Sequence, residues 1–309
     1  MEGHTQGHLK RNKKDVLFRI PKTSYFRTRY REISMIVVHS SEIETKKSLI
    51  LKEKRLDLLG SFVMKNKFSI EITSASLHMM AMFFMLCDHL WGTIVPGNDW
   101  LTCIGRISFP IFAFMIVEGY FHTKNLKKYV YRLLVFALLS EIPFNLAMGS
   151  SIFYPIHQNV LWSFLISIGL IYLNEKAKAT RKIWQQIVTG CITLILGYLL
   201  GILTMVDFYH AGILTVLVFY FFRQRKWWCY FGQLFCLWYI NTELLGGLAY
   251  EIQLFGETYF ILRQGFALLA LIPIWLYRGR QGYHNKIFQY ICYTFYPIHL
   301  LVLGLIKVL

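Results

Sequence analysis

The chain has 309 residues, of which 55% are hydrophobic and only 16% charged, and its formal net charge is +16. An ordinary soluble protein carries about a quarter charged residues, so this composition excludes a typical soluble enzyme and favours a membrane protein. The positive charge alone would suit a nucleic-acid binder. Beyond the N-terminal arm, however, Lys and Arg lie mainly in short connections between apolar runs, where membrane orientation signals occur. We therefore expect no nucleic-acid partner.

Residues 1–63 form a basic N-terminal extension with scattered aromatic residues and no apolar run long enough to span a bilayer. A charged opening without a following apolar segment does not match a secretory signal. The charge mixture predicts a disordered or loosely attached arm. We expect the functional unit to begin near Met64 and to cover residues 64–309, with residues 1–63 outside it.

Apolar stretches of membrane-spanning length follow one another from Ser74 onward. A bilayer core needs about 20 apolar residues per helix, so the remaining length predicts an all-α transmembrane bundle of about nine helices, within a range of about eight to ten. The expected spans are 75–95, 104–122, 129–147, 160–174, 183–205, 210–222, 226–245, 260–277 and 288 to the C-terminus.

Basic residues set the expected orientation of these spans. They lie before the first span and after the second, fourth, sixth and eighth, whereas the other connections are nearly free of Lys and Arg. Cytoplasmic loops carry the excess of positive charge, so the N-terminus is expected to be cytoplasmic and, with nine spans, the C-terminus outside. The sequence thus predicts a multi-pass protein of the cell membrane, in contact with the lipid bilayer.

Three ionisable residues inside expected spans are the first candidates for chemistry. An ionisable side chain at mid-membrane costs about 3 kcal/mol, so each one needs a reason. Asp88 and His89 are adjacent in the first span, and His299 lies near the middle of the last. Neighbouring helical residues point about 100° apart, so Asp88 and His89 need not touch. A His near a carboxylate suits general-base or acyl-accepting chemistry. The structural alternatives are a helix-end pair and a hydrogen bond between helices.

Arg106 opens the second span on the expected outer side. It could pair with Asp88 or Glu141, or grip an anionic substrate group with its planar guanidinium. Glu118 lies at the cytoplasmic end of the same span. It could form a salt bridge or stand at the mouth of a channel for a cytoplasmic cofactor, and the possible basic partners are Lys124, Lys128 and Arg132.

Most other polar residues of the spans fall in their expected outer halves, among them Glu141, Asn145 and Asn159. This distribution predicts a polar cavity open to the outer side. The six cysteines form no CxxC pair and lie within or beside apolar runs, so neither a metal site nor a disulfide framework is expected.

Four blocks of the sequence resemble the TraX family. They are MFFMLCDHLWG, GRISFPIFAFMIVEGYFHTKNLKKYVYRLLVFALLSEIPFN, HQNVLWSF and FYPIHLLVL, in the family's order and at similar spacing, and together they cover essentially residues 75–309. The resemblance implies acyl transfer within the membrane. The family is named for an acetylase of the conjugative pilin terminus, and a wider group of membrane enzymes passes acetyl from cytoplasmic acetyl-CoA to acceptors across the bilayer.

The resemblance also implies roles for particular residues. Asp88, His89 and His299 become the expected catalytic residues, and the expected substrate- or cofactor-binding residues are Arg106, Glu118, Glu141, Asn145 and Asn159. In this hypothesis His89, oriented by Asp88, deprotonates an acceptor amine or hydroxyl. Arg106 or Asn159 would stabilise the developing oxyanion.

The acceptor stays open at this point: a pilin-like N-terminus, a cell-surface glycan or a small molecule. An acetyl-His intermediate and direct transfer also both stay open. A proton-coupled transporter is an alternative, because intramembrane carboxylates and histidines also serve transport, but the two halves show no convincing repeat. A scaffold for envelope assembly is a third reading, and it would not need so many buried ionisable groups.

Overall fold

The structure is a computed structural model that describes residues 48, 51–52, 54–55, 72–254 and 256–309. The chain divides into two units, Met1–Ser69 and Ile70–Leu309. The extension expected at residues 1–63 therefore lies outside the described residues, apart from a few helical positions between 48 and 55.

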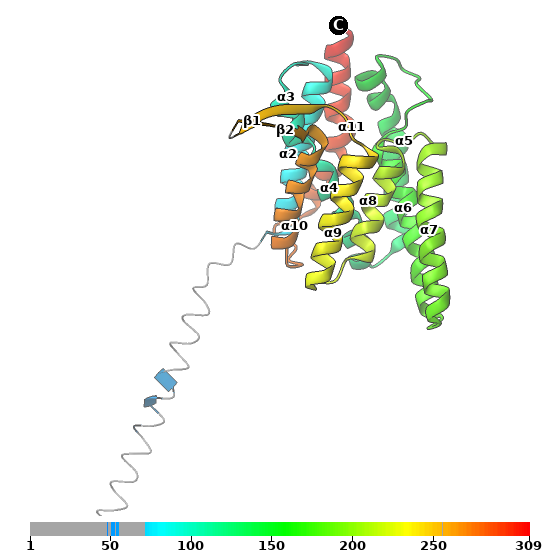
Figure 1. The fold of residues 1–309 in the computed structure, drawn as a ribbon. Helices are drawn as coiled ribbons and strands as arrows, with labels where there is room; N and C mark the ends of the chain where they lie inside the picture. Colours follow the sequence, from blue (N-terminus) through cyan, green and yellow to red (C-terminus); the bar gives the residue numbers. More distant parts are fainter. Residues whose placement is uncertain (1–47, 49–50, 53, 56–71, 255) are drawn as a thin grey trace, which may run out of the picture. The chain divides into compact units, whose positions relative to one another are not determined.

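The unit Ile70–Leu309 is a bundle of helices that run alternately between two ends (Figure 1). Its first half consists of α2 (Ser74–Thr93), α3 (Asp99–Gly105), α4 (Ser108–His122), α5 (Leu126–Gly149) and α6 (Val160–Ala179). The second half consists of α7 (Ile183–Leu203), α8 (Tyr209–Phe221), α9 (Trp227–Tyr239) with a π-helical turn η1 (Ile240–Leu244), strands β1 (Ala249–Leu254) and β2 (Glu257–Leu262), a 3₁₀ helix η2 (Arg263–Ala270), α10 (Leu271–Leu276) and α11 (Lys286–Val308).

Five helical stretches among the described residues are long and apolar enough to cross a membrane. They cover 99–122, 126–149, 160–179, 183–203 and 286–308, while 209–221 and 263–276 are shorter apolar helices. The expected all-α membrane bundle is thereby confirmed. Its core is built by residues spaced to face inward from different helices, such as the fully buried Leu77, Ile111, Ile171, Leu217 and Leu300.

The eighth expected span, 260–277, differs most from the structure. It begins in the hairpin of β1 and β2, which pair antiparallel from Ala249 opposite Leu262 to Leu254 opposite Glu257. The tight turn contains Gly256 at φ 84°, a conformation that favours glycine. The residues Thr-Tyr-Phe-Ile in β2 favour a strand, and only the stretch from Arg263 onward is helical. A short apolar run cannot distinguish strand from helix by its hydropathy alone.

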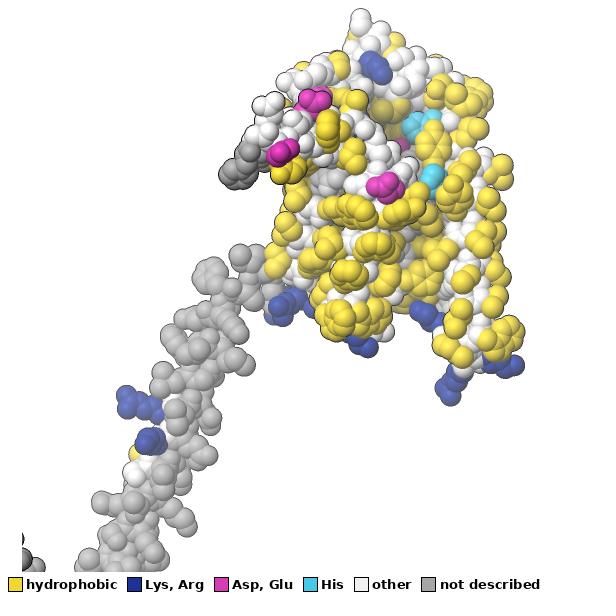
Figure 2. Space-filling model, in the orientation of Figure 1, with side chains coloured by type: hydrophobic (Ala, Val, Ile, Leu, Met, Phe, Trp, Pro, Cys, Tyr) yellow, Lys and Arg dark blue, Asp and Glu magenta, His cyan; other side chains and the backbone are white. Residues whose placement is uncertain are grey.

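Charge and hydrophobicity are separated along the bundle (Figure 2). Lys and Arg side chains gather at the end where the α6–α7, α8–α9 and α10–α11 connections lie, which we call the basic end. Hydrophobic side chains cover the flank between the two ends. On α7 the large residues Ile183, Ile187 and Ile195 are at least 60% exposed. Such an extensive apolar surface is stable only in lipid, so the chain is a membrane protein.

Two non-helical connections meet near the opposite end and position part of the site. In the α5–α6 connection, the Gln158 amide donates to the Met205 carbonyl at 2.9 Å, and the Asp207 amide in the α7–α8 connection donates to the Gln158 carbonyl at 2.8 Å. Asn159 then caps α6 beside Glu141, eight residues before the end of α5. At about 1.5 Å per residue, α6 begins about 12 Å below the end of α5. Non-helical backbone at such a depth is tolerated only inside protein or beside water.

Candidate functional site

His89 of α2 and His299 of α11 form a direct pair. Their rings are parallel within 6°, and His89 Nδ1 lies 2.6 Å from His299 Nε2. His299 Nδ1 lies 2.6 Å from the Phe295 carbonyl, which can only accept, so His299 Nδ1 carries its proton. His299 Nε2 must then accept from His89 Nδ1–H. This hydrogen-bond pattern assigns a lone pair to His89 Nε2, as a base or nucleophile requires.

Asp88 belongs to a separate network. Arg106 Nη2 donates to Asp88 Oδ1 at 3.0 Å, and the Thr102 hydroxyl donates to the same oxygen at 2.7 Å. The expectation that Asp88 orients His89 is therefore wrong, because the two point to different neighbours and His299 takes that role. Of the two partners expected for Arg106, the structure pairs it with Asp88. Gly105 allows this contact, since a Cβ there would overlap the backbone and Cβ of Asp88.

Glu141 and Asn159 connect α5 to the start of α6. Asn159 Nδ2 and Trp162 Nε1 donate to Glu141 Oε1 at 2.5 and 2.6 Å, and Asn159 Nδ2 also donates to the Ala137 carbonyl. Asn145 Nδ2 donates to the carbonyl of Ile152 at 3.3 Å. These expected binding residues thus already hold the backbone of the α5–α6 connection in place.

Glu118 lies at the basic end of α4, but its partners differ from those expected. Arg223, just after α8, donates from Nε to Glu118 Oε1 at 2.7 Å, and His122 Nδ1 lies 3.6 Å from Glu118 Oε2. Lys124, Lys128 and Arg132 were the partners expected from sequence. Arg223 is the partner instead because α4 and α8 pack side by side. This packing brings Glu118 and Arg223 together, although they are 105 positions apart in the chain.

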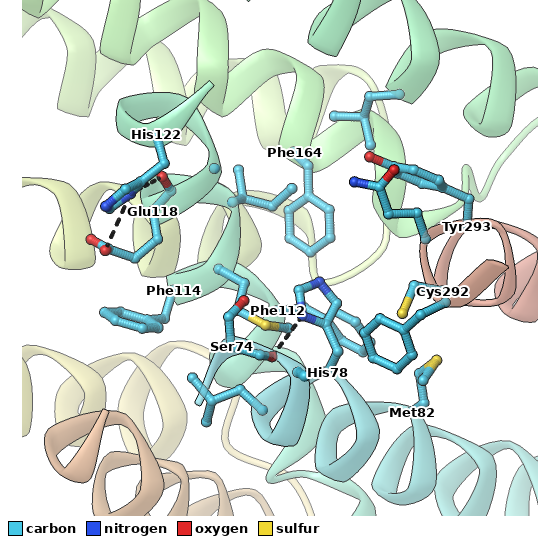
Figure 3. A pocket seen from close by; sticks show the side chains of 18 of the residues that line it. Ser74, His78, Met82, Phe112, Phe114, Glu118, His122, Phe164, Cys292 and Tyr293 are labelled. Carbon is cyan, nitrogen blue, oxygen red and sulfur yellow. Dashed lines mark hydrogen bonds and ion pairs between the residues drawn. The ribbon is translucent and has the colours of Figure 1, made fainter. Parts of the chain in front are cut away.

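A cavity of about 500 Å³ lies between α2, α4, α5 and α11 (Figure 3). Its lining at the basic end includes Glu118, His122 and His284, and its walls are mainly apolar. Glu118 thus both forms a salt bridge with Arg223 and lines the cavity. The cavity nevertheless differs from the outward-facing one that the sequence predicts: it occupies the basic half of the bundle, because the outer polar residues bond mostly to one another.

The deep end of this cavity is formed by Val160, Phe164 and Tyr296. Tyr296 is ten residues into α11, about 15 Å from its start. The Tyr296 ring centroid lies 6.3 Å from that of His89 and 5.9 Å from that of His299. The cavity therefore ends one side chain away from the histidine pair. Tyr296 was not among the site residues expected from the sequence.

A second histidine, His157, was also missed. Its Nε2 lies 3.4 Å from Asp207 Oδ1, across the two paired connections. The hydrogen bond to Asp207 raises the pKa of His157 above its usual value. His157 lies in the connection between α5 and α6, whereas the sequence candidates were sought among ionisable residues inside the expected spans. The sequence feature that could have indicated it is its position as the first residue of HQNVLWSF, one of the four blocks that resemble the TraX family.

Comparison with known proteins identifies the family of this chain. A family model described as TraX protein matches residues 73–307. The probable fimbrial assembly protein FimC, serogroup H1, of Dichelobacter nodosus is 31% identical over 77 residues, which are 24% of this chain and 32% of that protein. The chain thus spans about a third of that relative's length. No solved structure matches significantly. Since the family match covers most of the chain, the protein belongs to the TraX family.

Proposed function

We propose that the protein is a membrane acetyltransferase that moves an acetyl group from cytoplasmic acetyl-CoA to an amine or hydroxyl acceptor at the outer face of the cell membrane. One observation carries this proposal: His89, with a lone pair on Nε2, lies one side chain from the deep end of a cavity that begins at the basic end. A donor entering from the cytoplasm could reach the histidine pair through it.

The cavity suits the long, flexible arm of a thioester donor. Its volume of about 500 Å³ falls within the range of about 300–1,000 Å³ that is usual for ligand sites. Met82, Phe112 and Cys292 supply apolar walls, and His122 and His284 lie among the lining residues of the basic end. Acetyl-CoA would supply the activated acyl group, and the chain's residues would bind and orient its arm.

His89 performs the central step in this proposal. Its Nε2 lone pair attacks the thioester carbonyl carbon, the C–S bond breaks, and the thiolate leaves with the electron pair. His299 accepts the Nδ1–H of His89 throughout and stabilises the positive charge that develops on the imidazole. Arg106 and Asp88 fix α3 against α2 and so position His89, while Asn159 and Glu141 fix the start of α6.

A pilin-like N-terminus is the acceptor we propose first. The family bears the name of a protein associated with pilin acetylation, and the curated relative is named as a fimbrial assembly protein. A cell-surface glycan and a small molecule are the other acceptors that the test distinguishes.

The test uses purified full-length protein, radiolabelled acetyl-CoA and, as acceptor, a short peptide with a free α-amino group. We expect the wild type to transfer label and His89→Gln to lose at least about 100-fold of the rate. His210→Gln is the matched control, because the His210 ring packs on Tyr198 of α7. A wild type that neither binds acetyl-CoA nor transfers label to the peptide, a glycan fraction or a small amine would refute the proposal.

A further inference from the structure

A second histidine–carboxylate pair lies on the outer side of the cavity's end. His157 and Asp207 come from the α5–α6 and α7–α8 connections, which the two backbone hydrogen bonds at Gln158 hold together. Their side chains are 29% and 26% exposed, so the pair is packed in place yet reachable. Phe144 of α5 meets the His157 ring edge-on at 5.1 Å, and the Tyr209 ring stacks with it at 6.3 Å.

One member of the pair lies close in the chain to a residue that closes the cavity. Val160, three residues after His157, lines the deep end of the cavity together with Tyr296. His157 and Asp207 thus lie in the outer connections, with His157 three residues along the chain from a residue at the deep end of the cavity, whereas the cavity extends from the basic end.

The contact with Asp207 also fixes which nitrogen of His157 can act. Asp207 Oδ1 is an acceptor, so the nearby Nε2 of His157 carries the proton and Nδ1 carries the lone pair. A carboxylate that holds an imidazole in one tautomer and stabilises its protonated form is the arrangement that general-base catalysis requires.

We propose that His157, held by Asp207, is a second catalytic histidine that binds the acceptor and removes its proton during transfer. This inference rests on the proposed function. The acceptor's N–H or O–H proton moves to His157 Nδ1, and the freed electron pair attacks the acetyl carbonyl carbon on His89. The bond between that carbon and His89 Nε2 breaks, and its electron pair returns to the imidazole.

The charged surroundings of His157 give the step a pH signature. The groups that face it are Asp207 from the α7–α8 connection, Glu141 from α5, and Tyr209 at the start of α8. The hydrogen bond from Asp207 raises the pKa of His157. The base form exists only above that pKa, so the transfer rate rises with pH through it. Asp207→Asn removes the cause, and the rise should move to lower pH.

The experiment separates acetylation of the protein from transfer to the acceptor. Full-length His157→Gln is mixed with radiolabelled acetyl-CoA, and protein-bound label and label on the peptide amine are followed over time. We expect the variant to acquire label as fast as the wild type but to pass it to the peptide at least about 100-fold more slowly. Hydroxylamine, which is unprotonated at neutral pH and needs no base, should discharge both proteins equally.

Two controls make the outcome decisive. His210→Gln removes a neighbouring outer histidine and should behave as the wild type, and Asp207→Asn should retain transfer with a shifted pH profile. Wild-type transfer rates in His157→Gln, or an unmoved profile in Asp207→Asn, would overturn the inference while leaving the acetyltransferase proposal intact. A wild type without any acetyl transfer would instead overturn the proposed function itself.

Discussion

At the scale of single residues, the site depends on which partner holds each polar atom. The Phe295 carbonyl determines the proton position on His299, and His299 in turn determines it on His89. Each assignment follows from an acceptor that cannot donate. The two histidines therefore form an ordered chain of hydrogen bonds. In this chain His299 fixes the tautomer of His89, a role that a carboxylate has in many other catalytic histidine sites.

Replacing His299 tests this chain. His299→Leu removes the acceptor of His89 Nδ1–H and leaves the tautomer of His89 free, so we expect acetyl transfer to fall by about 100-fold. His299→Gln offers a carbonyl oxygen to the same proton and should restore part of the rate. The measurement is transfer of radiolabelled acetyl by each purified variant. Equal rates for the Leu and Gln variants would contradict the ordered chain.

The Asp88–Arg106 pair should affect stability more than chemistry. Arg106→Met leaves Asp88 with its charge uncompensated, and removal of one partner from a largely buried pair costs about 3 kcal/mol. The double variant Asp88→Asn with Arg106→Met removes both charges and should recover most of the loss. Thermal unfolding in detergent measures both. A double variant as unstable as the single one would show that the ion pair does not set the stability.

At the scale of helices, close approach between backbones fixes the site. α3 lies against α2 at Gly105, where any Cβ would overlap Asp88, and α7 meets the first residues of α8 at Gly201, where a Cβ would overlap the backbone of His210. Both contacts therefore require glycine, which has no Cβ, at positions 105 and 201. Hydropathy alone could not reveal them, because a glycine in an apolar run reads the same whether or not another helix touches it.

A matched pair of glycine substitutions tests this interpretation. Gly105→Ala forces α3 away from Asp88 and should destabilise the protein by about 1–3 kcal/mol. Gly169→Ala should instead stabilise it by up to about 1 kcal/mol, because alanine favours helix. Among the described residues, no atom outside its own helix backbone and chain neighbours lies within 4 Å of a Cβ placed at Gly169. Unfolding midpoints that shift in the same direction would contradict the close packing.

At the scale of the whole molecule, the fold was more predictable than the site. Continuous apolar length predicts where the helices lie, since the bilayer imposes it. It fails only at the start of the expected span 260–277, where residues 260–262 belong to strand β2. The His89–His299 contact joins positions 210 apart, and the Glu118–Arg223 pair joins positions 105 apart, so tertiary packing alone creates them. His89, His299 and Glu118 could be selected as candidates from the sequence, but their partners could not be predicted from it.

Orientation in the membrane gives the last prediction. In a variant without the native cysteines, Lys182→Cys places a thiol at the basic end and Glu257→Cys places one in the hairpin at the other end. Because basic loops stay in the cytoplasm, a membrane-impermeant maleimide should label the Glu257→Cys variant in intact cells and the Lys182→Cys variant only after permeabilisation. The reverse labelling pattern would contradict the orientation and, with it, the route of the donor.

The separation of the cavity, which begins at the basic end, from the His157–Asp207 pair in the outer connections has an electrical consequence. In the proposed reaction the thiolate is left on the basic side, while the acceptor's proton is released on the outer side. Each turnover then displaces one positive charge outward through part of the membrane. A potential that is negative inside opposes this by at most about 2.3 kcal/mol per 100 mV. Acetylation would therefore be electrogenic, and the membrane potential of an energised cell would oppose it.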